Sequence, residues 1–190
     1  MTAVDQPRPV VGIDFDLPDG WWCLDLDDPQ LAERLGERFY SLRAGGRKIT
    51  SESERRVAAE LRELVERGAG IALLHPADDT WPTAICGGVF VGSIDVDGAE
   101  LFRTLDDEGE PVALGDLSGI PIVSHIRREP VDHRRPSPIL HITYFICAPG
   151  MCIVIKFVAP EIVAANCIVN DVATVISAAR VVLSDQGCPV

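Results

Sequence analysis

The stretch ILHITYFICAPGMCIVIKFV, residues 139–158, decides the fold that we predict for this chain. It is long and apolar enough that a membrane-spanning helix is the first alternative. The dipeptide Pro149-Gly150 at its centre is a strong turn signal, and β-branched residues on both sides favour strands. His141 and Lys156 also lie within it. We therefore expect an antiparallel hairpin around Pro149-Gly150 and no membrane insertion.

Further strands are expected upstream of this hairpin. Apolar runs bounded by turn residues are typical of strands. Leu17-Pro18-Asp19-Gly20 is such a turn, and it separates the first two runs. Gly87 and Gly88 within a later run indicate a bulge or a close approach of another group. The predicted strands are residues 10–15, 21–26, 70–75, 83–94 and 120–128.

Helical periodicity appears in four segments. Asp28-Pro29 predicts a capped helix start, with a stop at Gly45-Gly46. Ser51-x-x-Glu54 has the form of a capping box, and that helix should end at Gly68. A short helix is expected at 97–105, and Pro160-Glu161 should open a C-terminal helix. The apolar stripe of the second helix is Val57, Leu61, Leu64 and Val65, and that of the last is Ile162, Ala165, Val169, Val172, Ile176 and Ala179.

This order of elements predicts the fold class α+β. Strands that follow one another as hairpins, with the helices segregated from them, favour an antiparallel β-sheet flanked by α-helices, an α/β/α sandwich. The 190 residues suit a single domain, 1–190. The ends, 1–9 and 184–190, are expected to be flexible.

The composition excludes several function classes. A formal net charge of −12 disfavours nucleic acid and anionic membrane surfaces as partners. Residues 1–9 lack the apolar run of a signal peptide, which points to a cytoplasmic protein with reduced thiols. The six cysteines form no CxxC pair, and the acidic residues from Asp14 onward fail the spacing of a calcium loop. We expect no metal and no cofactor.

The tetrapeptide Pro18-Asp19-Gly20-Trp21 follows the first strand, and a helix pair, an Ile-Pro-Ile-Val strand at 120–123, a hairpin and an aliphatic C-terminal helix come after it. This layout resembles the small actinobacterial proteins of the PsbP-like, Ran-binding import-factor-like fold, of which the LpqN lipoproteins are one branch. The resemblance implies a sheet sandwiched by helices and a non-enzymatic binding or assembly role. The chain departs from LpqN-type lipoproteins because it shows neither their signal peptide nor their lipidated cysteine.

The first candidate site is a polar face of the sheet. Residues two apart share a face of a strand, so His125 and Arg127 lie together, and His141 shares a face of the hairpin with Thr143. If the strand registers agree, Lys156 joins them. Such a group would bind a carboxylate or phosphate, or supply a general base. The alternative is a set of separate sheet residues that solvent or helix ends satisfy.

The second candidate site is a basic segment around one loop. Its members are rare positive residues in an acidic chain and could dock an acidic partner or a phosphate. The alternative is a solvated loop with internal ion pairs. The segment comprises Arg127, Arg128, His133, Arg134 and Arg135.

The C-terminal helix carries little charge for a solvated helix. Its polar side is Asn166, Asn170, Thr174 and Ser177. Either this side is covered by the rest of the domain, or it meets a partner or a second copy.

Cys147 and Cys152 flank the hairpin turn, so they could face each other and be oxidised to a disulfide, although packing is the simpler role for them.

These observations predict a non-catalytic binding or assembly protein that acts through protein–protein contacts with a partner or as a homo-oligomer. The alternative is a small-ligand-binding protein or enzyme that uses the His125, Arg127, His141 and Lys156 face. No catalytic motif such as a phosphate-binding loop or a nucleophile elbow supports that alternative.

Overall fold

The structure is a computed structural model and describes residues 10–75, 85–108, 112–129, 139–160 and 165–183. The predicted flexible ends and the predicted loop at 132–138 lie outside these residues. The elements are β1 (Val10–Phe15), β2 (Trp22–Asp25), α1 (Leu31–Ala44), α2 (Ser51–Glu66), β3 (Ile71–His75), β4 (Ile85–Gly92), α3 (Gly98–Asp107), β5 (Val112–Leu117), β6 (Ile120–Glu129), β7 (Ile139–Ala148), β8 (Met151–Pro160), α4 (Ala165–Ser177) and β9 (Ala179–Leu183).

Seven strands form one antiparallel sheet in the order β2-β3-β4-β8-β7-β6-β5, and β1 pairs with β9 in a separate ribbon. The hairpin that residues 139–158 predict is confirmed as β7 and β8, with Ala148 opposite Met151 across the turn. No helix among the described residues has the length and apolar character needed to cross a membrane. The chain is therefore an α+β protein with an antiparallel sheet flanked by helices, as predicted.

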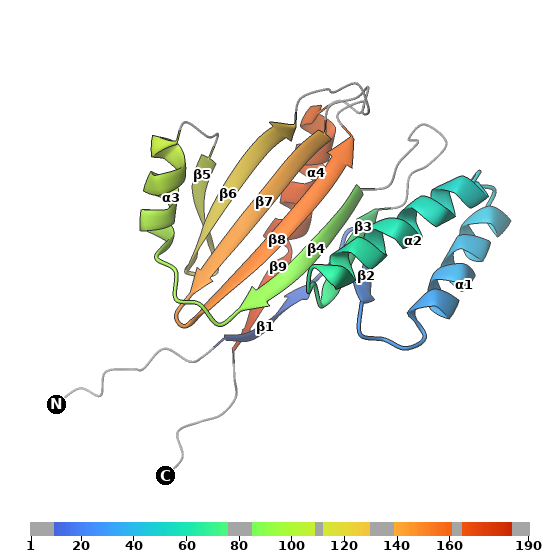
Figure 1. The fold of residues 1–190 in the computed structure, drawn as a ribbon, viewed down its shortest axis with the longest axis horizontal. Helices are drawn as coiled ribbons and strands as arrows, with labels where there is room; N and C mark the ends of the chain where they lie inside the picture. The colour runs from blue at the N-terminus through green and yellow to red at the C-terminus, as the bar shows by residue number, and fades with distance from the viewer. Residues whose placement is uncertain (1–9, 76–84, 109–111, 130–138, 161–164, 184–190) are drawn as a thin grey trace, which may run out of the picture.

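One face of the sheet is covered by α4 together with the β1–β9 ribbon (Figure 1). The core between them is shielded from solvent. The strands contribute Ile142, Ile155 and Phe157, and α4 contributes Val172 and Val175, and all five are fully buried. Burying such side chains is the main favourable contribution to folding, at about 1.5–3 kcal/mol each. The hairpin and the last helix therefore form the centre of the molecule.

The other face is covered only in part. Helices α1 and α2 pack over β2 and β3 through a second apolar cluster that includes Leu35, Phe39, Leu61 and Leu74. Helix α3 lies at the opposite edge of the sheet, beside β5, β6 and the end of β7 (Figure 1). The middle strands of this face lie between the two helical groups.

Gly87 and Gly88 of β4 are sites of close approach, as predicted, whereas Gly92 has ordinary contacts only, and the pairing of β4 with β3 stays in register without a bulge. A Cβ atom at Gly87 would lie 2.5 Å from the ring of Phe157. A Cβ atom at Gly88, on the opposite face, would lie 2.6 Å from Leu64 Cδ2 of α2. The turn at Pro18–Trp21 also forms, with a hydrogen bond from Trp21 N to Pro18 O and Gly20 at φ +90°.

Two helix starts differ from the prediction. Helix α1 begins at Leu31 after Gln30, because Asp28 accepts a hydrogen bond from Gln30 N and so shapes a turn ahead of the helix. Helix α2 begins at Ser51 itself, so Ser51 does not cap it. The Glu54 carboxylate pairs instead with Arg43 of α1.

Other differences concern burial and the number of strands. Val65 is 49% exposed, so it is not part of the buried stripe. The C-terminal helix ends at Ser177, and β9 begins two residues later. The predicted opening of this helix at Pro160-Glu161 is wrong at Pro160, which is the last residue of β8, and Glu161 lies outside the described residues. Strand β5 was also not predicted.

Candidate functional site

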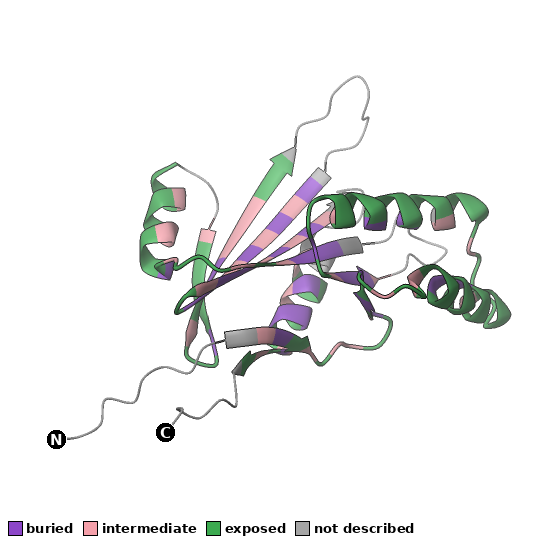
Figure 2. Cartoon of the chain, turned by 60° about the horizontal axis from the view of Figure 1, so that its bottom comes forward, coloured by how far each residue is buried: buried purple, intermediate pink, exposed green. Residues whose placement is uncertain are grey.

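The strands β6, β7 and β8 present one face between α2 and α3 that none of the described helices crosses, and we call it the open face (Figure 1). Along β7 from Leu140 to Ile146 and along β8 from Ile153 to Val158, buried residues alternate with half-buried ones, which appears as stripes in Figure 2. Because successive side chains of a strand point to opposite faces, this alternation assigns the buried set to the α4 side and the half-buried set to the open face. The open face is therefore the accessible side of the central sheet.

The strand registers bring the four predicted site residues together on this face. Lys156 lies opposite Thr143, and Thr143 lies opposite His125, so these three form one row across the sheet. In the next row His141 lies opposite Arg127. Residues directly opposite have Cβ atoms about 4.5–5.5 Å apart, and diagonal neighbours lie about 7–8 Å apart. His125 and His141 are such diagonal neighbours.

Accessibility supports a binding surface on the open face. Arg127 is exposed, whereas His125, His141 and Lys156 are half-buried. The next row continues with half-buried apolar side chains, since Phe145 lies opposite Val154. The open face thus combines basic and imidazole groups with an apolar floor.

This arrangement can recognise anionic groups. Guanidinium and ammonium groups donate charge-assisted hydrogen bonds to carboxylates and phosphates, and imidazole adds donors or acceptors according to its protonation. A rigid sheet holds these donors in a fixed geometry, which reduces the entropy lost on binding. The chain has a net charge of −12, so a local basic surface is selective for acidic partners.

The predicted basic segment is not brought together as one group by the described residues. Arg128 is exposed but belongs to the face opposite Arg127, because the two are neighbours on β6. His133, Arg134 and Arg135 lie outside the described residues. Only Arg127 of this segment can be assigned to the open face.

The polar side of α4 is exposed at Asn170 and Thr174, so no described element covers those two residues. The Thr174 hydroxyl donates to Asn170 O at 2.9 Å, and that of Ser177 donates to Ala173 O at 2.8 Å. Both hydroxyls are therefore satisfied within the helix itself, by the carbonyl four residues earlier. The side chain of Asn166 lies outside the described part of the structure.

Cys147 and Cys152 lie directly opposite each other, as predicted. Both are buried and free. Burial raises the pKa of Cys147 to about 11, and the neighbouring Cys152 contributes to this shift. A thiol with a raised pKa is a weak nucleophile at neutral pH, so this pair does not resemble a catalytic cysteine site.

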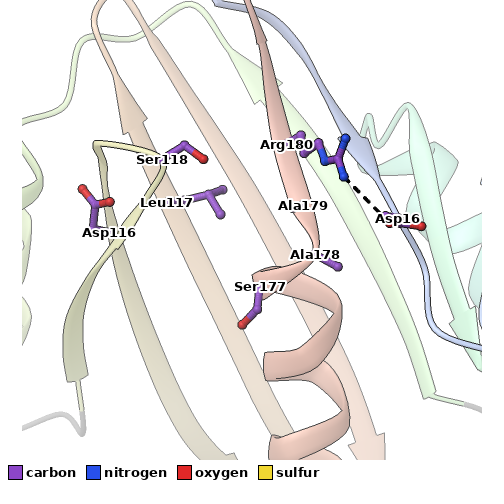
Figure 3. A pocket seen from close by; sticks show the side chains of 8 residues that line it. All are labelled: Asp16, Asp116, Leu117, Ser118, Ser177, Ala178, Ala179 and Arg180. Atoms are coloured by element: carbon purple, nitrogen blue, oxygen red, sulfur yellow. Dashed lines mark ion pairs between the residues drawn. The ribbon is translucent and has the colours of Figure 1, made fainter.

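A hollow that no sequence pattern indicated lies on the α4 side of the sheet. Its volume is about 400 Å³, and it lies between the β5–β6 turn, the end of α4 and the start of β9 (Figure 3). Arg180 and Asp16 form an ion pair at its rim, with an N–O distance of 3.9 Å. The hollow could not be predicted because both β5 and β9 were absent from the prediction.

The sequence matches no protein-family model and no curated protein. Among solved structures the chain is similar to a protein from Bacteroides thetaiotaomicron, with 11% identity and a TM-score of 0.46 over 93% of this chain. The chain spans 47% of that protein's length. With TM-scores below 0.5, neither this likeness nor the two that follow assigns the chain to a family.

Two further solved structures are similar over nearly the whole chain. One is LpqN, involved in cell envelope biogenesis of Mycobacterium tuberculosis, with 16% identity, a TM-score of 0.42 and coverage of 92% of this chain and 84% of LpqN. The other is the cyanobacterial PsbP (CyanoP) from Synechocystis sp. PCC 6803, with 14% identity, a TM-score of 0.45 and coverage of 93% and 92%.

Proposed function

We propose that this protein is a non-catalytic binding protein that holds an acidic segment of a protein partner on the open face. The observation that carries the proposal is the register that gathers His125, Arg127, His141 and Lys156 on one accessible face. The apolar floor at Phe145 and Val154 supplies contact area, and the basic groups select for acidic side chains. Together they suit a protein surface better than they suit a buried reaction centre.

The location and the family branch belong to the same proposal. A reducing cytoplasm would keep the thiols of Cys147 and Cys152 free. The net charge of −12 supports a protein partner over nucleic acid. The Pro18–Trp21 turn supports an actinobacterial LpqN-like origin, because it is the local motif on which the resemblance rests.

Charge reversal on the open face tests the proposal. The variant Arg127→Glu/Lys156→Glu is compared with Arg47→Glu/Arg180→Glu, which makes the same change of charge at two exposed positions, one after α1 and one on β9 on the other side of the sheet. Partners are captured from an extract of the source cells with each protein, identified, purified and measured by calorimetry. We expect the open-face variant to bind at least about tenfold more weakly, because like charges then face each other.

The control variant should bind the same partner as the wild type does. Affinity for the wild type should also fall as salt rises, since exposed charges are screened. Equal binding by the open-face variant and the control would contradict the proposal.

The diagonal histidines favour a second function, the binding or turnover of a small anion. Two imidazoles beside Lys156 could hold a phosphate or carboxylate, or exchange a proton with it. Inorganic phosphate and acetate are suitable probes, followed by NMR of the imidazole protons. Saturable shifts of both His125 and His141 would favour this function over a protein partner.

A further inference from the structure

A second, smaller hollow lies next to the one in Figure 3, under the β5–β6 edge of the sheet and against α4. Its volume is about 220 Å³. The space exists because Ala113 and Gly115 on β5 and Ala173 on α4 have small side chains. A Cβ atom at Gly115 would already lie 3.2 Å from Ile122 Cγ2, so the strand has little room for a larger residue.

The walls of this smaller hollow are mainly apolar, and its polar members besides Tyr144 are Asp116, Ser124 and Ser177. Leu117, Ile122 and Ile176 line it, and they are 7%, 9% and 5% exposed. In another protein an engineered apolar cavity of about 150 Å³ binds benzene, so about 220 Å³ is enough for a molecule with one ring. Size and lining together select a small, mainly apolar molecule.

Tyr144 supplies the polar contact. It lines the hollow, is 8% exposed, and its hydroxyl forms no hydrogen bond with any residue that the structure describes. A tyrosine hydroxyl without a protein partner can donate a hydrogen bond to a ligand. Burial raises the pKa of Tyr144, so its hydroxyl stays protonated and remains a donor at neutral pH.

The other hydroxyls of the lining are already used. Ser124 Oγ donates to Ala113 O at 3.5 Å, and Ser177 Oγ donates to Ala173 O. Among the described lining residues, the Tyr144 hydroxyl is therefore the side-chain donor that a ligand can engage.

We propose that this hollow binds a small uncharged molecule with one apolar ring and one hydrogen-bond acceptor, to which the Tyr144 hydroxyl donates. The larger hollow, drawn in Figure 3, is adjacent to it, because Asp116, Leu117 and Ser177 line both. The site is on the opposite side of the sheet from the open face, so it is separate from the proposed partner surface.

Acetophenone and ethylbenzene form a matched pair of probes, because they have the same ring and differ in the carbonyl acceptor. Methyl NMR spectra of the wild type should show that both perturb Leu117, Ile122 and Ile176. The Tyr144→Phe variant should bind acetophenone about 2- to 12-fold more weakly, since a hydrogen bond contributes about 0.5–1.5 kcal/mol. Its affinity for ethylbenzene should not fall.

Filling the hollow gives an independent test. Ala173→Leu should abolish binding of both probes, whereas Thr174→Leu, on the exposed side of the same helix, should leave binding unchanged. Perturbation of methyl groups elsewhere in the protein, or unchanged acetophenone binding by Tyr144→Phe, would overturn the proposal. These two results are decisive even if Ala173→Leu does not fold.

Discussion

Gly87 and Gly88 face opposite sides of β4, and a neighbouring side chain covers each of them. The ring of Phe157 occupies the space beside Gly87, and it is fully buried, so it cannot move aside without disturbing the core. Near Gly88 an added Cβ would meet Leu64 and, at 3.0 Å, the ring of Phe90; both side chains are half-buried and can adjust more easily. The two adjacent glycines therefore differ in how well they tolerate a side chain.

Gly87→Ala should lower the free energy of unfolding by about 1–3 kcal/mol, the usual cost of overpacking a core. Gly88→Ala should cost less, because Leu64 can rotate. Gly36→Ala is the matched control: it lies in α1 with no atom within 4 Å of an added Cβ, and it should stabilise by about 0.5–1 kcal/mol. Urea denaturation measures all three, and equal effects at Gly87 and Gly36 would contradict the packing described here.

Cys147 should make stability depend on pH in alkaline solution. Its pKa is raised from an ordinary value of 9.0 to about 11, mainly by burial, so folding favours the protonated thiol. Its contribution is fully present below pH 9 and is lost as pH rises toward 11, because the unfolded thiol ionises first. Between about pH 8 and about pH 10.5, wild type should lose more stability than Cys147→Ala does. If urea denaturation shows the same loss of stability with pH in the wild type and in Cys147→Ala, this thiol does not cause the pH dependence.

The site residues were predictable to the extent that strand periodicity decides them. Alternation alone placed His141 and Thr143 on one face, and the register then added Lys156. The exposure of Val65 was not predictable, because helical spacing gives a direction but not the extent of the layer that covers it. The hollow beside Tyr144 depends on contacts between distant segments, which no local pattern records.

At the scale of elements, β1 and β9 show what the sequence pattern could not decide. The apolar run at 179–183 continues the spacing of α4, so periodicity favoured a longer helix. The structure instead pairs these residues with β1, in a register that joins Val10 to Leu183 and Phe15 to Ala179. Short apolar runs are ambiguous between helix and strand, and here a partner at the other end of the chain decides.

Ile13→Ala should loosen both strands of this ribbon. Ile13 is 9% exposed, packs in the core with α4 and lies opposite Val181. Truncating a buried isoleucine costs about 2–5 kcal/mol. Amide hydrogen exchange should therefore accelerate in 179–183 as well as in β1. Asp14→Ala, at an exposed neighbouring position, should leave exchange in 179–183 nearly unchanged. If 179–183 were a helix, exchange there would not respond to Ile13→Ala, and that result would contradict the ribbon.

At the scale of the whole molecule, the charge balance bears on which partner the open face accepts. A net charge of −12 makes two copies of this chain repel each other, and this repulsion is strongest at low salt. The open face is a basic region within that acidic surface, so it attracts acidic segments while the remainder disfavours close approach. Association with a second copy must overcome this repulsion, whereas a partner with a small acidic segment need not.

The pure protein should accordingly be a monomer of 20.6 kDa at low salt. Light scattering coupled to size exclusion measures the molar mass directly. Comparing about 0.05 M with about 0.5 M salt tests the charge repulsion, because the Debye length shortens from over 10 Å to below 8 Å. A dimer at both salt concentrations that Arg127→Glu/Lys156→Glu dissociates would identify a second copy as the occupant of the open face. A dimer that this variant leaves intact would place self-association on another surface, such as the neutral side of α4. In that case Thr174→Arg should dissociate the dimer, because each copy would bring a positive charge to the contact.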